Sequence, residues 1–118
     1  MWQVVTTDLF NNWLIQQDEA TQEKVLAALI ALQKQGPNLG RPLVDTIYDS
    51  KFTNMKELRI QHKGKPLRAF FVFDPIRQAV VLCIADKSGK KRFYKEMLLV
   101  AEQQYEQHLK DLGDLNHG

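Results

Sequence analysis

The alternation of apolar and polar residues predicts a short strand and two helices in the first third of the chain. The run WQVVTT is typical of a short strand, and Thr7 or Asp8 can cap a short helix through LFNNWLIQQ. After Asp18, apolar residues recur at the i, i+3, i+4 and i+7 spacing of an amphipathic helix. Gly36 and Pro37 end this helix, because proline cannot continue it. We therefore expect a helical hairpin.

Three strands and a closing helix are predicted in the rest of the chain. A segment with two prolines and a glycine, residues 37–54, is expected to be a connector. The expected strands are the alternating run at 55–62, the aromatic run at 67–73 and the continuous β-branched run at 79–86. An apolar stripe predicts a helix over residues 92–113, and residues 113–118 are expected to be a frayed tail.

This order, β-α-α-β-β-β-α, predicts an α+β fold with a small, mostly antiparallel sheet and helices packed on one face. Residues 1–118 are expected to form a single domain, long enough for a hydrophobic core. No apolar run approaches the roughly 18 residues of a membrane span, and the N-terminus does not resemble a signal peptide, so we expect a cytoplasmic protein. A single cysteine, Cys83, excludes an internal disulfide bond and a zinc site made of several thiolates.

The predicted hairpins determine which residues share a face of the sheet. We expect the first turn at Gly64-Lys65 and the second loop at Asp74–Arg77. In these registers Phe71 lies between Leu58 and Val80, on an apolar face that packs against the helices. A one-residue error in either turn would move every side chain of a strand to the other face.

The opposite face of the predicted sheet gathers basic side chains. Arg59, Arg68 and Lys87 share it, together with Glu57 and Phe70. One interpretation is a pair of cross-strand salt bridges between Glu57 and the two arginines. The other is a floor that binds phosphate groups, on which Phe70 stacks against a base.

Positive charge is concentrated in the same part of the chain. The net charge is +2, but residues 51–95 contain twelve cations and three acids, which gives +9. The flanking segments 1–50 and 96–118 carry −3 and −4. Such a segment favours a polyanionic partner, because neutralisation of phosphates supplies most of the non-specific affinity for nucleic acids. The alternative is a solvated charged surface.

The runs KELR, LRAFFVFDP and DKSGKKRFY together resemble the HigB-like, phage-derived branch of the RelE/ParE toxin superfamily. The resemblance is close over residues 55–97 and extends to nearly the whole chain through the order of the elements. It implies a RelE-like fold and the toxin of a type II toxin–antitoxin pair, with a helix-turn-helix, HigA-like antitoxin as partner. RelE-like and HigB-like toxins cleave mRNA on the ribosome, whereas ParE-like members inhibit DNA gyrase. A non-catalytic RNA-binding or regulatory subunit is a third alternative. No cofactor and no membrane partner are expected.

Metal-free cleavage of RNA requires removal of the 2′-hydroxyl proton, stabilisation of charge on the phosphate and protonation of the leaving 5′ oxygen. By the resemblance, Arg59 and Arg68 are expected to stabilise the phosphate, because a guanidinium keeps its charge and fits two phosphoryl oxygens. Lys87, Lys91 and Tyr94 are the candidates for proton transfer, since neighbouring cations lower the pKa of a desolvated lysine or tyrosine. The residues expected to bind RNA are Lys56, Lys63, Lys65, Phe70, Lys90, Arg92 and Lys95.

Other ionisable residues leave their roles open. His62 is either a general base or a histidine at a turn. Cys83 is either a thiol with a lowered pKa or a small buried apolar residue. Asp74 and Asp86 are isolated in the sequence and the histidines are scattered, so no metal site is expected.

Overall fold

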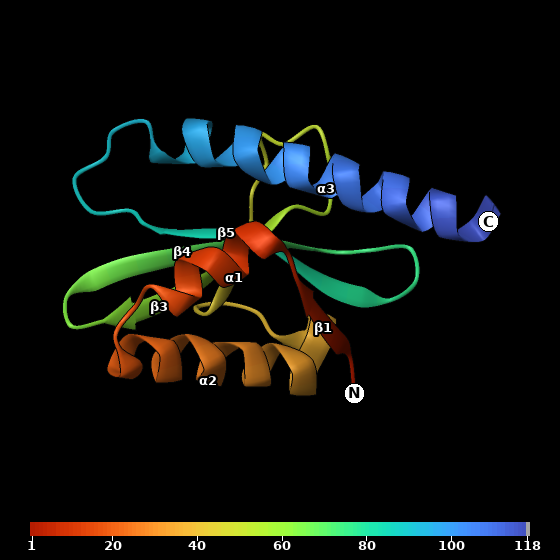
Figure 1. Ribbon diagram of the computed structural model, residues 1–118. Helices are drawn as coiled ribbons and strands as arrows, with labels where there is room; N and C mark the ends of the chain where they lie inside the picture. Colours follow the sequence, from red (N-terminus) through yellow and green to blue (C-terminus); the bar gives the residue numbers. More distant parts are fainter. Residues whose placement is uncertain (118) are drawn as a thin grey trace.

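A five-stranded sheet runs through the middle of the molecule, with helices on both sides of it (Figure 1). The computed structural model describes residues 1–117, with side chains as far as Gly113. The strands are β1 (Gln3–Thr6), β2 (Val44–Thr46), β3 (Lys56–His62), β4 (Lys65–Phe73) and β5 (Gln78–Asp86). They lie in the order β1-β5-β4-β3-β2, in which β1 pairs parallel with β5 and all other neighbours are antiparallel.

The predicted helical hairpin is confirmed, and so is the predicted cap at Thr7. In α1 (Asp8–Ile15) the hydroxyl of Thr7 accepts a hydrogen bond from the backbone of Phe10 at 3.1 Å. In α2 (Glu19–Gln35) the carboxylate of Asp18 caps the first turn in the same way. Gly36 ends α2 at a φ of 52°, and a side chain there would also collide with the indole of Trp2, so glycine is required. A short 3-10 helix, Gly36–Asn38, follows.

Helices cover both faces of the sheet, so the prediction that they pack on one face was wrong. On one face Leu58, Ala69 and Phe71 pack under α1 and α2. On the other, Phe70 and Val72 pack under α3 (Phe93–His117), which lies alone on its side in Figure 1. The reason lies in β4 and β5, whose apolar residues point to both sides. Full burial of one phenylalanine contributes roughly 1.5–3 kcal/mol, and that contribution requires a cover on each face.

The first hairpin is shifted by two residues from the predicted register. Its turn is Lys63-Gly64, where both residues have positive φ (51° and 78°), the geometry of a two-residue I′ turn. Leu58 therefore opposes Ala69, and Arg59 lies directly opposite Arg68. A shift of two residues preserves the side-chain faces, because the pleat repeats every two residues. The grouping of the two arginines on one face is confirmed.

The second hairpin is shifted by one residue at its start, which places part of β5 on the wrong predicted face. Phe73 opposes Ala79, and Val80 consequently lies on the α3 face instead of the α1/α2 face. The carboxylate of Asp74 determines this loop by accepting hydrogen bonds from the backbone of Gln78 and Ile76. A bulge beside Phe70 and Phe71 then absorbs one residue, so the end of β5 returns to the predicted faces.

Two further differences concern the ends and the number of elements. The segment expected to be only a connector contains β2, which adds one strand to the predicted order. The helix α3 continues to His117, past the predicted end at Gly113; Gly118 of the predicted tail lies outside the described residues. Within residues 1–117, no helix has the length and apolar character needed to cross a membrane.

Candidate functional site

A buried carboxylate, Glu57, joins three of the predicted site residues. Its Oε1 accepts a hydrogen bond from the Tyr94 hydroxyl at 2.9 Å and from Arg59 Nε at 3.1 Å. Arg68 Nε lies 3.2 Å from the same oxygen. The register of β3 and β4 puts the two arginines opposite each other, and the first turn of α3 brings Tyr94 over them. We call these four residues the Glu57 cluster.

The salt bridges that the sequence suggested between Glu57 and the two arginines are therefore present. A buried carboxylate is tolerated only when its charge is compensated, and only 5% of the Glu57 side chain is exposed. The Arg68 contact is a close charge pair without the alignment of a hydrogen bond. The hydrogen bond to Glu57 raises the pKa of Arg59, so this guanidinium stays charged.

The salt bridges do not use all the donors of the two guanidinium groups. Arg59 Nη2 also contacts Asp45 at 3.1 Å, and Arg68 Nη1 donates to the backbone carbonyl of Leu67 at 3.0 Å. The remaining terminal nitrogen of each arginine makes no aligned hydrogen bond in the described part of the chain, although the Arg68 guanidinium lies close enough to the Tyr94 hydroxyl to lower its pKa. Arg59 is 38% exposed and Arg68 12% exposed, so both can donate to an anion that approaches the cluster.

Tyr94 lies in an environment that differs from the predicted one. Burial raises the pKa of its hydroxyl, and Glu57 raises it further, while Arg68 opposes this shift. The expectation of a lowered pKa was wrong, because burial beside a carboxylate outweighs the neighbouring cations. The ring stacks on Phe70 with centroids 5.9 Å apart, and Lys87 Nζ lies 5.5 Å from the ring centroid. Tyr94 is therefore a protonated donor at neutral pH.

The ring of Phe70 is inaccessible to a stacking base, because the sheet face that was predicted to be open is covered. It is fully buried beneath Phe93 and Tyr94, because α3 covers the face of the sheet that was expected to be open. Tyr94 also borders an apolar hollow of about 360 Å³, which has Ile47 and Leu98 among its other walls. The sequence did not indicate this hollow. It adjoins the Glu57 cluster, because Tyr94 belongs to both.

Most of the remaining predicted cations lie in the β3–β4 turn and in the loop that follows β5, with two exceptions. The turn between β3 and β4 carries Lys63 and Lys65, and it lies beside the loop 87–92, since the backbone of Lys87 donates to Pro66. Lys90, Lys91 and Arg92 in that loop are exposed. We call the exposed cations of the turn and the loop the cationic rim: Lys63, Lys65, Lys90, Lys91 and Arg92.

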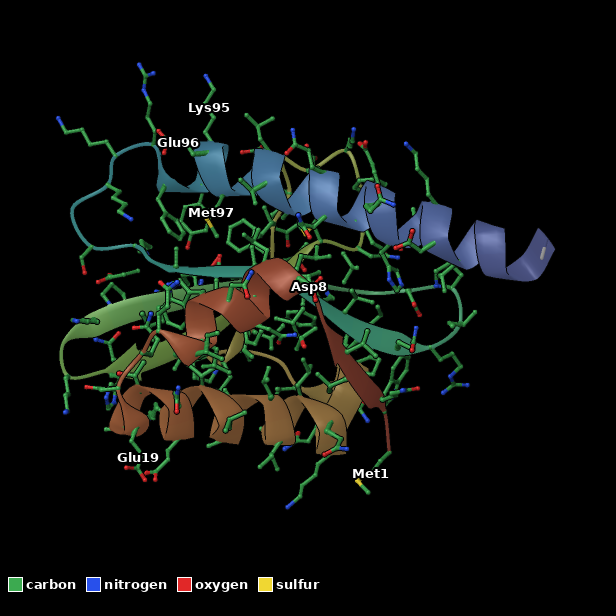
Figure 2. The ribbon with its side chains drawn as sticks, in the orientation of Figure 1. Met1, Asp8, Glu19, Lys95, Glu96 and Met97 are labelled. Carbon is green, nitrogen blue, oxygen red and sulfur yellow. The ribbon has the colours of Figure 1, made fainter. Side chains whose placement is uncertain are left out.

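Lys56 and Lys95 are the exceptions. Lys56 points to the α1/α2 face of the sheet and its Nζ donates to Thr46 Oγ1 at 3.3 Å, so it does not join the cluster. Figure 2 shows Lys95 pointing outward from the first turn of α3, whereas Met97 points toward the sheet. Lys95 borders the apolar hollow next to Tyr94 and does not belong to the cationic rim.

The other ionisable residues do not contribute to the cluster. Burial raises the pKa of Cys83 to about 12, which confirms the buried apolar interpretation; Cys83 opposes Phe70 rather than Arg68. His62 is half-buried on the α2 face of the sheet, away from the Glu57 cluster. His108 contacts the buried carboxylate of Asp74 at 2.8 Å and connects α3 to the β4–β5 loop. Local sequence patterns do not indicate this pair, because its residues are 34 positions apart.

Comparison with known proteins identifies the family of this chain. Residues 12–106 match the phage-derived Gp49-like proteins (DUF891). The chain belongs to this family. Two Mycobacterium tuberculosis proteins that carry toxin names are similar to it: HigB2, with 41% identity over 104 residues, and HigB3, with 39% identity over 107 residues. The matches cover 86% and 90% of this chain. This Gp49-like chain spans about half the length of HigB2 (52%) and nearly all of HigB3 (92%).

The fold also resembles a solved structure. The isolated E. coli RelE toxin superposes with a TM-score of 0.52 over 82% of this chain and 96% of RelE. The sequence identity is only 8%, so this likeness concerns the fold alone. The predicted RelE-like fold is confirmed, and so is the predicted similarity to HigB-like, phage-derived proteins.

Proposed function

We propose that this Gp49-like chain is the toxin of a toxin–antitoxin pair and an endoribonuclease that cleaves mRNA on the ribosome. The observation that supports the proposal most is the Glu57 cluster, which holds two arginines and a tyrosine at one site beside the cationic rim. The toxin names of HigB2 and HigB3 support the same class of function. In this proposal the partners are the ribosome, mRNA and a helix-turn-helix antitoxin, and the protein acts in the cytoplasm.

The arginines supply the charge stabilisation that cleavage requires. Attack of the 2′ oxygen on the adjacent phosphorus places additional negative charge on the phosphoryl oxygens. The free donors of Arg59 and Arg68 can bind these oxygens, and the ion pairs with Glu57 hold the two groups in place before the substrate arrives. Glu57 is thus a positioning residue, because it acts through the arginines.

Tyr94 is suited to donate a proton to the leaving group. A tyrosine with a raised pKa is protonated at neutral pH, so it can donate a hydrogen bond and a proton to the 5′ oxygen as the bond from phosphorus breaks. The candidates to accept the 2′-hydroxyl proton are Lys87, which lies over the Tyr94 ring, and Lys91 of the loop. The cationic rim binds the phosphates of the flanking nucleotides.

A translation assay with and without ribosomes, followed by primer extension on the mRNA, tests the proposal. We expect new 5′ ends only when ribosomes are present, and their loss in Arg68→Ala. Lys110→Ala, which removes an exposed cation on α3 outside the cluster, is the control and should cleave normally. Intact mRNA under all conditions, or cleavage unchanged in Arg68→Ala, would exclude the proposed activity. Gyrase-dependent DNA damage with intact mRNA would instead support the ParE-like alternative.

A further inference from the structure

Charged side chains of alternating sign form a continuous row across the sheet, and this row extends beyond the Glu57 cluster. In order of contact its members are Arg68, Glu57, Arg59, Asp45 and Arg41, which we call the alternating row. The row contains one more cation than acids. Its inner end is nearly buried, whereas the outer end is open, with 74% of the Arg41 side chain exposed.

The strand β2 holds the outer half of the alternating row in place. Asp45 lies directly opposite Glu57 in the pairing of β2 with β3, so both carboxylates reach Arg59 from the same face of the sheet. The second oxygen of Asp45 accepts a hydrogen bond from the backbone of Thr46 at 2.9 Å. The backbone of Arg59 donates to the carbonyl of Leu43 at 2.7 Å. These contacts fix β2 and the residues just before it against β3.

One carboxylate oxygen brings together two guanidinium groups that would otherwise repel each other. Arg41 Nη2 and Arg59 Nη2 each lie 3.1 Å from Asp45 Oδ2, so the two nitrogens cannot be more than twice that distance apart. The hydrogen bond from Arg41 lowers the pKa of Asp45, so this carboxylate is charged at neutral pH. Within the described residues, Arg41 donates only through Nη2. The two arginines are therefore close enough, and have donors enough, to bind successive phosphates of one strand.

The alternating row has a direction relative to Tyr94. Arg68 is at the end beside the Tyr94 hydroxyl, whose pKa it lowers, and Arg41 is at the other end. In the proposed reaction Tyr94 protonates the leaving 5′ oxygen, so the nucleotides on the 3′ side of the scissile phosphate lie toward Tyr94. The attacking 2′ oxygen is in line with the leaving oxygen on the opposite side of phosphorus. The nucleotides on the 5′ side therefore lie toward Arg41.

We propose that Arg41 binds the RNA phosphate immediately 5′ to the scissile phosphate, and that Asp45 positions Arg41 beside Arg59 for this contact. The RNA chain then crosses β4, β3 and β2, with the scissile phosphate at Arg59 and Arg68. Because the ligand is the substrate of the Glu57 cluster, this assignment rests on the proposed function. The phosphate at Arg41 does not react, so the contact strengthens the binding of the substrate and of the transition state equally.

Arg41→Gln tests the assignment in the ribosome-dependent cleavage assay. An exposed ion pair contributes little to stability, so the variant should fold normally. We expect KM for ribosomes programmed with mRNA to rise about tenfold and kcat to stay within about twofold of the wild type, because one charged hydrogen bond is lost equally from both states. Arg77→Gln, which removes an exposed arginine from the β4–β5 loop, is the control and should retain wild-type values of both.

A neutral phosphate at the assigned position isolates the contact. Primer extension locates the cleavage site of the wild type, and a synthetic mRNA then carries a methylphosphonate immediately 5′ to that site. We expect this mRNA to raise KM about tenfold for the wild type and to cause no additional change for Arg41→Gln, because each alteration removes the same charged hydrogen bond.

Two results would overturn the assignment alone, with cleavage by the wild type intact. The first is an equal effect of the methylphosphonate on the wild type and on Arg41→Gln. The second is a loss of kcat in Arg41→Gln, which would show that Arg41 acts only through Asp45 on the position of Arg59. Intact mRNA with the wild type would instead exclude the nuclease, and the assignment of Arg41 would fail with it.

Discussion

The hydroxyl of Tyr94 donates a hydrogen bond to Glu57, a residue 37 positions earlier in the chain, at 2.9 Å. This contact connects the start of α3 to the middle of β3, directly beside the two arginines that share Glu57. The position of the helix and the orientation of the guanidinium groups therefore depend on the same carboxylate oxygen. Any change to this oxygen should alter both stability and activity.

Glu57→Gln should reduce both the activity and the stability of the protein. The amide retains the shape of the side chain but removes the negative charge, so Arg59 and Arg68 lose their common partner. Breaking a fully buried ion pair costs about 3–5 kcal/mol, and the partial exposure of Arg59 should reduce the loss here to roughly 1–3 kcal/mol. Urea unfolding measures the stability, and primer extension measures cleavage.

The exposed carboxylate of Asp49 provides the control for this substitution. Asp49→Asn also removes one negative charge, but from the protein surface, and should change neither property. Equal effects of the two substitutions would mean that Glu57 acts only through the net charge.

Tyr94→Phe should reduce cleavage with little effect on stability. Phenylalanine retains the stacking on Phe70, and Glu57 retains its two arginine partners, so the free energy of unfolding should change by only about 1 kcal/mol. If the hydroxyl protonates the leaving oxygen, the cleavage rate should fall by about 10²–10⁴, the usual contribution of a general acid. Tyr48→Phe, at a side chain that is 83% exposed, is the matched control.

An unchanged rate in Tyr94→Phe would show that the hydroxyl takes no part in the reaction. A large loss of stability together with the rate would assign Tyr94 a role in packing instead. The two measurements together separate these outcomes.

The sequence was sufficient to predict that Arg59 and Arg68 share a face, although the predicted turn was displaced. That error was two residues, which the period of the pleat tolerates. The error in the second hairpin was one residue, and it moved Val80 to the opposite face. A bulge cannot be located from the alternation of residues, because the alternation of a strand buried on both faces carries no information about register.

The sequence does contain a signal for a helical cover on both faces of the sheet. The run from Phe70 to Phe73 is apolar at every position, which already indicates a strand buried on both sides. The environment of Tyr94 could not be predicted in the same way. It depends on how the first turn of α3 lies over Glu57, and this is determined by the packing of Phe93 and Leu98 on the sheet.

Cys83 should make the protein less stable at alkaline pH. Burial raises the pKa of its thiol from 9.0 to about 12. In the unfolded chain the thiol loses its proton near pH 9, whereas in the folded protein it keeps the proton up to about pH 12. The folded state binds more protons between these values, so the free energy of unfolding should be unaffected below pH 9 and decrease above it.

Comparison with Cys83→Ala isolates this effect. Two tyrosines, Tyr94 and Tyr105, also have raised pKa values, but they start from 10.0, so the interval from pH 9 to 10 reports mainly on the thiol. Chemical unfolding at several pH values should give a shallower decrease for Cys83→Ala in that interval. A parallel decrease in both proteins would contradict the assignment.

The pair of Asp74 and His108 should stabilise the end of the molecule opposite the cationic rim. Burial tends to raise the pKa of Asp74, but hydrogen bonds from His108 and Gln78 outweigh it and lower the pKa below 3.8. A carboxyl group with a lowered pKa contributes stability that is present above its unfolded value and is lost as the pH falls through its folded value. His108→Ala should therefore lower the free energy of unfolding by about 2 kcal/mol at pH 7, the contribution of a hydrogen bond to a charged group. The difference from the wild type should shrink below pH 3.8, where Asp74 becomes protonated.

Gln103→Ala, at an exposed position of α3, should leave stability unchanged at both pH values. Because the pair lies far from the Glu57 cluster along β4, cleavage of mRNA by His108→Ala at a temperature where it remains folded should match the wild type; a lower rate would show that this end of α3 also positions Tyr94.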